Sequence, residues 1–254
     1  MARSDILRIK DELLETMLDS FRSDDLLRKN LILQGGGALH FIYGSPRHSN
    51  DLDFVCEDLK NIQDEVKDRF KKGIEFNGTK IVPELKNLDS SYPDRPFIRA
   101  KYSLGQNQPT VSLELLSQKS FDNSATEGKY NPIKVESPTE IYADKIAATL
   151  IRMKERGSFK GTDLFDLNYI DTNFNKKASF NDIKDKVLSY NKLHVLNPDV
   201  SHRVIQYICD PKNQEEFKRT IKKTLLADVS SHMEMDRKYF EGAANHFMQY
   251  LGDL

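Results

Sequence analysis

The stretch Leu31–Phe54, LILQGGGALHFIYGSPRHSNDLDF, decides the fold of this chain. An apolar run at 31–33 stops at Gly35-Gly36-Gly37, and 38–43 then has a helical composition. The polar loop that follows leads into Asp51–Cys56, which opens with acidic and apolar residues in alternation, Asp51-Leu52-Asp53-Phe54, as in a strand. This order predicts a buried strand, a tight glycine turn, a helix and a second strand.

Asp51 and Asp53 are the candidate metal-binding residues of this stretch. They lie two positions apart on the expected strand, so their carboxylates project from one face. The glycines Gly35, Gly36 and Gly37 let the backbone approach a ligand closely, and the N-terminus of the next helix offers N–H groups to a phosphate. Mg²⁺ prefers carboxylate and phosphate oxygens, so the pattern predicts a metal-dependent site for phosphoryl or nucleotidyl transfer.

Two residues of the intervening loop each have several interpretations. Arg47 either closes on a phosphate or pairs with Asp51. Ser49 either contacts a nucleotide phosphate, is a site where the protein modifies itself, or bonds its own backbone as turn serines often do. The sequence leaves these alternatives open.

A third carboxylate is expected on a neighbouring strand. In VSLELLS, residues 111–117, Glu114 lies on one face and its apolar neighbours on the other. Glu114 is therefore the first candidate for a metal ligand or general base. Glu84, in IVPELKNL, is the second candidate.

Composition sets the broad class of the protein. The 254 residues suit one large or two small domains. Lys and Arg number 38 against 39 Asp and Glu, so a global basic charge gives no argument for nucleic-acid binding. Two cysteines exclude a cysteine-rich zinc site. No run approaches the roughly 18 apolar residues of a membrane span, and we expect no signal peptide and a cytoplasmic protein.

The chain changes character near residue 136. An α+β half is expected over 1–135 and an all-helical half over 136–254, the latter opening with a capping box at Ser137–Glu140 and a helix to about Arg156. The strands expected are 80–88, 97–104 and 110–116, with a loop at 120–131. The other helices expected are 5–21, 58–71, 162–171, 181–190, 200–208, 211–226 and 236–251.

The helix that opens the second half carries a cationic stripe. Lys145, Arg152 and Arg156 fall within about 40° of one another at 100° per residue. Lys145 is the candidate ligand of a triphosphate, and Arg152 would assist it. Asp163 could orient the lysine or accept a proton. Asp166, three residues later, is a structural partner of Lys145 or Arg152.

The remaining polar residues give weaker signals. The six histidines show no ligand spacing, so no histidine metal cluster is expected; His40 is interpreted as structural and His48 as a stacking or proton-transfer residue. The segments 176–177 and 217–223 are rich in lysine. They are either part of a basic groove for RNA or solvated faces balanced by Glu215 and Glu216.

Two segments resemble the AbiEii/AbiGii family of nucleotidyltransferase toxins, including its MenT-like members. Arg47, Ser49, Asp51 and Asp53 match the family's first motif position by position. Residues 137–167 match the second, through Ala143-Asp144-Lys145, Arg152 and 163–167. Two positions depart from the family: Gly37 replaces a hydroxyl residue, and Thr162 replaces an arginine.

The resemblance implies a nucleotidyltransferase fold with a helical second half that contributes to the active site. It implies an NTP substrate, Mg²⁺ or Mn²⁺, a cognate antitoxin and an RNA acceptor such as a tRNA 3′ end, in a type IV toxin–antitoxin or phage-defence system. Transfer to a small molecule or a protein is the alternative within the enzyme class. A nucleotide-binding protein without catalysis is the alternative outside it.

Overall fold

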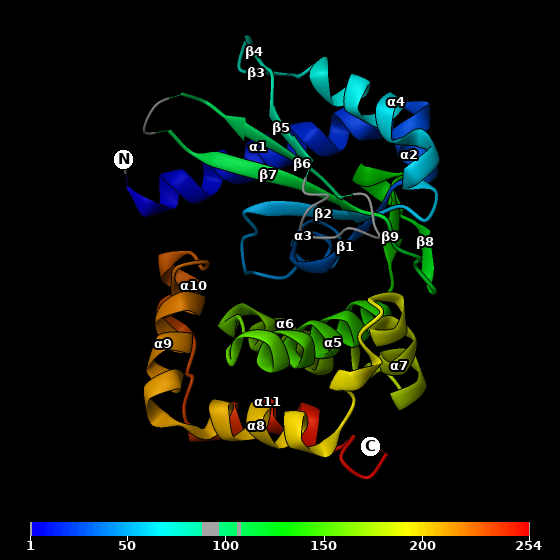
Figure 1. Ribbon diagram of the computed structural model, residues 1–254. Helices are drawn as coiled ribbons and strands as arrows, with labels where there is room; N and C mark the ends of the chain where they lie inside the picture. Colours follow the sequence, from blue (N-terminus) through cyan, green and yellow to red (C-terminus); the bar gives the residue numbers. More distant parts are fainter. Residues whose placement is uncertain (1, 88–96, 106–107, 254) are drawn as a thin grey trace. The chain divides into compact units, whose positions relative to one another are not determined.

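The computed structural model describes residues 2–87, 97–105 and 108–253 (Figure 1). The chain forms two compact units, residues 1–137 and 138–254. The expected fold class, a mixed sheet with helices followed by an all-helical half, is confirmed. None of the described helices is both long and apolar enough to cross a bilayer.

The first unit is built on a seven-stranded mixed sheet in the order β5-β6-β7-β2-β1-β9-β8 (Figure 1). β2 lies in the middle, antiparallel to β1 and parallel to β7. A hairpin of β3 and β4 forms a separate small sheet. The strands are β1 (Ile32–Gln34), β2 (Asp51–Val55), β3 (Ile74–Phe76), β4 (Thr79–Ile81), β5 (Glu84–Asn87), β6 (Phe97–Ser103), β7 (Thr110–Leu116), β8 (Asn123–Ala125) and β9 (Lys134–Glu136).

Alternation along β7 and the helical period of α1 (Arg3–Ser23) produce the core of this unit. Val111, Leu113 and Leu115 are buried on one face of β7, while Glu114 on the other face is partly exposed. The buried stripe of α1 packs against β7 and β3. The other helices of the unit are α2 (Asp25–Asn30), α3 (Gly35–Phe41), α4 (Leu59–Lys71) and the 3₁₀ turn η1 (Gly128–Tyr130).

Three local predictions were wrong. The helix after β1 begins at Gly35 rather than at residue 38, so the glycines form its first turn. Residues 120–131 were expected to be a loop, but β8 lies within them. All three residues of β8 are exposed, so no apolar alternation marks it in the sequence. The expected strand 80–88 is divided between β4 and β5, and residue 88 lies outside the described residues.

The second unit contains helices and no strand among its described residues. α5 (Pro138–Arg156) packs against α6, α7 and α8, and it begins and ends where the sequence predicts. Gly161, at the start of α6, packs against Phe217, which leaves no room for a side chain. The remaining helices are α6 (Gly161–Phe174), α7 (Phe180–Ser189), η2 (Leu193–Val195), α8 (Pro198–Cys209), α9 (Pro211–Lys222), α10 (Ala227–His232) and α11 (Arg237–Met248).

Candidate functional site

Asp51, Asp53 and Glu114 lie on two neighbouring parallel strands. Asp53 on β2 is directly opposite Glu114 on β7, and Asp51 is directly opposite Ser112. Opposed residues on neighbouring strands project to the same face, about 4.8 Å apart along the hydrogen-bonding direction. The three carboxylates therefore share one face of the sheet, and all three are partly exposed there. This oxygen-only donor set fits a hard divalent cation.

Arg99 fixes the carboxylate of Glu114. Arg99 lies opposite Glu114 on the antiparallel strand β6. Its Nε donates to Glu114 Oε1 at 2.8 Å, and Nη2 lies 2.6 Å from the same oxygen. No sequence pattern marks Arg99 as a site residue, because only the register of β6 against β7 places it beside Glu114.

Glu84, the second candidate for the third carboxylate, lies at the far edge of the described sheet. It sits on β5 in the row of Asp51, with β6 and β7 between them. Three strand spacings of about 4.8 Å separate the two residues by roughly 14 Å. Glu84 instead forms an ion pair with Lys86 at 3.1 Å. Its position argues against a role beside Asp51 and Asp53.

The glycine turn lies directly against these carboxylates. Gly35 has φ +67°, and a Cβ built on it would be 3.1 Å from Asp53 Oδ2. A Cβ on Gly36 would collide with the guanidinium of Arg47. Thus the missing side chains allow Asp53 and Arg47 to approach the first turn of α3.

The close approach of β2 to α3 gives a reason for glycine at position 37, where the family has a hydroxyl residue. A Cβ there would lie 3.1 Å from the Asp51 carbonyl oxygen and from Leu52 Cδ2. Contacts this short require the neighbouring atoms to move. A serine or threonine at this position would therefore need a shift of β2 relative to α3.

Ser49 holds the turn that precedes β2. Its hydroxyl donates to the Asp51 carbonyl at 2.8 Å and accepts from the Asp51 N–H at 3.4 Å. The residue is 6% exposed. Of the three interpretations that the sequence leaves open, this geometry fits the serine that bonds its own backbone.

A second polar group lies in the helical unit, between α5 and α6. Lys145 Nζ lies 3.0 Å from Asp163 Oδ1 and 2.8 Å from Asp166 Oδ2. Arg152 Nη1 lies 2.5 Å from Asp163 Oδ2. Two cations thus face two carboxylates, and both carboxylates are almost completely buried.

Asp163 is held in its ionised form. Burial raises the pKa of its carboxyl, but the charges of Lys145 and Arg152 outweigh burial and lower it to about 2. A general base works best when its pKa is near the operating pH. Of its two expected roles, orienting Lys145 therefore fits Asp163 better than accepting a proton.

Asp144, the middle residue of Ala143-Asp144-Lys145, and its neighbour Lys145 have different ion-pair partners. The fully buried Lys186 lies 2.5 Å from Glu140 and 3.0 Å from Asp144. This ion-paired group joins α5 to α7 and has a structural role.

Among the lysine-rich segments, Lys218 pairs with Glu215 at 2.7 Å and Lys177 with Asp171 at 3.3 Å.

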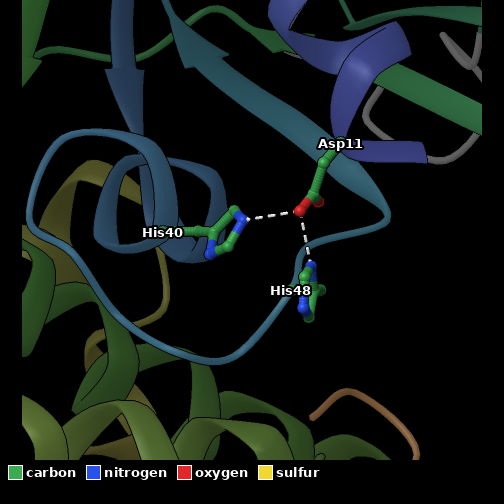
Figure 2. Close-up of side chains that lie close together, drawn as sticks. All are labelled: Asp11, His40 and His48. Carbon is green, nitrogen blue, oxygen red and sulfur yellow. Dashed lines mark hydrogen bonds and ion pairs between the residues drawn. The ribbon is translucent and has the colours of Figure 1, made fainter. Parts of the chain in front are cut away.

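Two of the histidines, for which no metal cluster was expected, lie together beside one carboxylate. His40 and His48 both contact the carboxylate of Asp11 on α1 (Figure 2). The three ligand atoms lie within 4.8 Å of one another. No short spacing in the sequence reveals this group, because Asp11 is 29 residues from His40 and the fold alone joins them.

Two solved structures are similar to the chain. The chain resembles JHP933 from Helicobacter pylori, with 18% identity over 97% of this chain and 94% of that one, at a TM-score of 0.49. It also resembles a candidate nucleotidyltransferase from H. pylori, with 20% identity over 96% and 95% of the two chains, at a TM-score of 0.50. No curated protein matches the chain.

A family model covers nearly the whole chain. The model of the nucleotidyl transferase AbiEii toxin, type IV toxin–antitoxin system, matches residues 16–250. The match includes both the carboxylate group of β2 and β7 and the cationic group of α5 and α6. The chain belongs to the AbiEii family of nucleotidyltransferase toxins.

Proposed function

We propose that this nucleotidyltransferase is Mg²⁺-dependent and transfers a nucleoside monophosphate from an NTP to an RNA hydroxyl, the 3′ end of a tRNA being the first candidate. The observation that carries the proposal is the parallel register that sets Glu114 opposite Asp53, beside a glycine turn against which the Asp53 carboxylate packs. Carboxylates next to backbone without side chains can accommodate a metal-bound triphosphate.

Asp51 and Asp53 would hold the metal, with Glu114 as the third carboxylate. A bound Mg²⁺ or Mn²⁺ would polarise the phosphate oxygens and favour the deprotonated form of the attacking hydroxyl. Arg99 orients the Glu114 carboxylate, and the turn 35–37 would offer backbone N–H groups to the phosphates. Arg47, which lies over Gly36, would supply a positive charge at the same place.

The reaction exchanges one phosphorus–oxygen bond for another. The acceptor oxygen forms a bond to the α-phosphorus, and the bond from the α-phosphorus to the bridging oxygen of the β-phosphate breaks. Pyrophosphate leaves, and the proton of the acceptor hydroxyl passes to a carboxylate of this face or to water. Glu114 is our candidate for this carboxylate if it does not bind metal.

We propose that Lys145 and Arg152 serve the same reaction by neutralising phosphate charge. Asp163 and Asp166 hold the Lys145 ammonium in place, so little side-chain freedom remains to be lost on binding. Preorganised cations stabilise developing negative charge better than mobile ones. The helical unit would then contribute to catalysis as well as to stability.

The toxin family implies an antitoxin partner, and a growth-inhibiting role follows from transfer to tRNA. RNA is favoured as the acceptor by the resemblance to toxins that modify tRNA. A small-molecule or protein acceptor is the competing assignment, and the experiment below separates the three.

The test is label transfer. The purified protein, Mg²⁺ and each α-³²P-labelled NTP are incubated with total tRNA, in parallel with Asp53→Asn and Glu84→Gln variants. We expect label in tRNA with wild type and Glu84→Gln, and a loss of roughly 100-fold or more with Asp53→Asn, the scale of losing a key electrostatic group. Glu84→Gln is the matched control, because it removes a carboxylate from the same sheet about 14 Å away.

Other outcomes would overturn parts of the proposal. Label on the protein itself would move the acceptor to a side chain of this chain. In a parallel reaction with cell extract in place of tRNA, label found only in a small molecule would rule out RNA as the acceptor. Equal labelling by wild type and Asp53→Asn would remove the carboxylates of β2 from the mechanism.

A further inference from the structure

We propose that Asp11, His40 and His48 form a binding site for a transition-metal ion of the Zn²⁺ class, in addition to the carboxylate group of β2 and β7. The three residues come from α1, from α3 and from the loop before β2 (Figure 2). None of them belongs to the proposed catalytic set. The proposal is independent of which nucleotide or acceptor the enzyme uses.

The geometry brings three ligand atoms to one point. His48 Nδ1 lies 2.6 Å and His40 Nε2 lies 3.1 Å from the same oxygen, Asp11 Oδ2. All three ligand atoms lie within 4.8 Å of one another. A Zn²⁺ ion bonds imidazole nitrogen and carboxylate oxygen at about 2.0–2.2 Å, so ligands of one ion are at most about 4.4 Å apart. Small side-chain rotations therefore suffice to place all three on one ion.

The hydrogen bonds of His40 favour this interpretation. Its Nδ1 lies 2.8 Å from the Ser45 carbonyl oxygen. A carbonyl oxygen only accepts, so Nδ1 carries the proton and donates it. Nε2 lies 3.1 Å from Asp11 Oδ2, which also only accepts, so without metal Nε2 donates to the carboxylate. A metal ion would take the place of that proton, because histidine binds metal in its neutral form. Histidine ligands of metals commonly donate their other ring N–H to a backbone carbonyl in this way.

Asp11 provides a second, independent observation. Both imidazoles approach Oδ2, whereas Oδ1 is buried and has no hydrogen-bond partner among the described residues. An unsatisfied buried carboxylate oxygen has a high desolvation cost. A metal ion that the carboxylate binds would compensate this cost by charge.

The donor set selects the class of metal. Two imidazole nitrogens and one carboxylate oxygen suit Zn²⁺ and neighbouring transition metals, while Mg²⁺ prefers oxygen alone. Three protein ligands leave a fourth position for water. Because His40 follows the glycine turn and His48 precedes Asp51 by three residues, a bound ion would tie α1 to both ends of the segment 40–48.

The experiment measures Zn²⁺ binding directly. Wild-type protein is freed of metal with a chelator, dialysed and titrated with Zn²⁺ by calorimetry, in excess Mg²⁺ to fill the carboxylates of β2. Bound zinc is then counted by elemental analysis. We expect one Zn²⁺ per chain in wild type. Affinity should fall by roughly 100-fold or more in His40→Asn and Asp11→Asn, since outer-shell changes alone cost about 10–100-fold.

The control is His202→Ala, which removes an exposed histidine from α8 and should leave Zn²⁺ binding unchanged. Circular dichroism of each variant separates misfolding from loss of a metal ligand. The number of Zn²⁺ ions bound per wild-type chain tests the proposal even if every variant fails to fold. Wild-type protein that binds no Zn²⁺ would overturn the proposal and leave a hydrogen-bonded Asp–His–His group. Unchanged affinity in folded His40→Asn and Asp11→Asn would also overturn it, because the zinc would then sit elsewhere.

Discussion

Glu114 lies directly opposite Asp53 in the parallel ladder of β2 and β7, and its Oε1 also accepts the hydrogen bond from Arg99 Nε at 2.8 Å. An acidic residue of the candidate site is thus held by a cation from the next strand. This contact fixes the orientation of one of the three carboxylates on this face of the sheet. Preorganised sites of this kind are favourable for stabilising charge that develops during a reaction.

Arg99 is expected to act as a positioning residue. In Arg99→Gln, Glu114 loses its ionic partner, so we expect nucleotidyl transfer to fall by roughly 10-fold and to need more Mg²⁺, a smaller loss than the about 100-fold of a removed electrostatic group. Arg99→Lys should restore part of the activity because the charge returns. The measurement is the rate of label transfer against Mg²⁺ concentration. An Arg99→Gln enzyme with wild-type Mg²⁺ dependence would contradict this role.

Gly35 is expected to be essential for activity beyond its effect on stability. Gly35→Ala places a Cβ at φ +67° and 3.1 Å from Asp53 Oδ2, so it should displace the carboxylate. Gly78→Ala is the matched control, because Gly78 has φ +72° with open space around its Cβ position. Both variants should lose about 1–2 kcal/mol of unfolding free energy from the left-handed backbone. Only Gly35→Ala should lose most of its label transfer; equal losses would show that strain alone matters.

Lys145 is expected to support the fold of the helical unit. Its side chain is 14% exposed and faces the buried Asp163 and Asp166. Lys145→Met removes the ammonium that pairs with both buried carboxylates, so unfolding free energy should fall by roughly 3 kcal/mol. The measurement is urea unfolding followed by circular dichroism. Lys145→Met combined with Asp166→Asn should recover part of the loss, and no recovery would show that the two side chains are not coupled.

His246 is expected to make stability depend on pH. Burial lowers the pKa of its imidazole to about 4 from the ordinary 6.5. Its Nε2 donates to Asn168 Oδ1 at 2.8 Å and its Nδ1 accepts from the Tyr142 hydroxyl at 3.0 Å, which is the pattern of a neutral ring. The unfolded chain therefore takes up a proton near pH 6.5, while the folded chain resists it until about pH 4.

The folded chain therefore loses stability as the pH falls below 6.5. The contribution of His246 to stability is complete above pH 6.5 and declines as the pH falls toward 4, by about 3 kcal/mol at 1.36 kcal/mol per pKa unit. Unfolding free energies of wild type and His246→Gln, measured from pH 8 to 4, should converge as the pH falls. Below about pH 4 the protonation of Asp163, with a pKa of about 2, acts on both proteins alike. Parallel curves between pH 6.5 and 4 would contradict the prediction.

Local patterns in the sequence were enough to predict the order of elements from β1 to α4 and the start of the second unit. The alternation of Asp51–Phe54 and the capping box at Ser137 each act over a few residues, so their structure follows from local geometry. The family motifs added the activity class, since the same short segments carry it. Exposed strands such as β8 were missed because nothing apolar marks them.

The tertiary structure decided which distant side chains meet. Strand register set Glu114 beside Asp53, placed Arg99 next to it and moved Glu84 to the sheet edge. Packing of α1 brought Asp11 to His40 and His48, and packing of α6 on α5 gave Asp163 its two cations. Such contacts depend on the sum of many weak packing interactions along the chain, and no short pattern of residues encodes that sum.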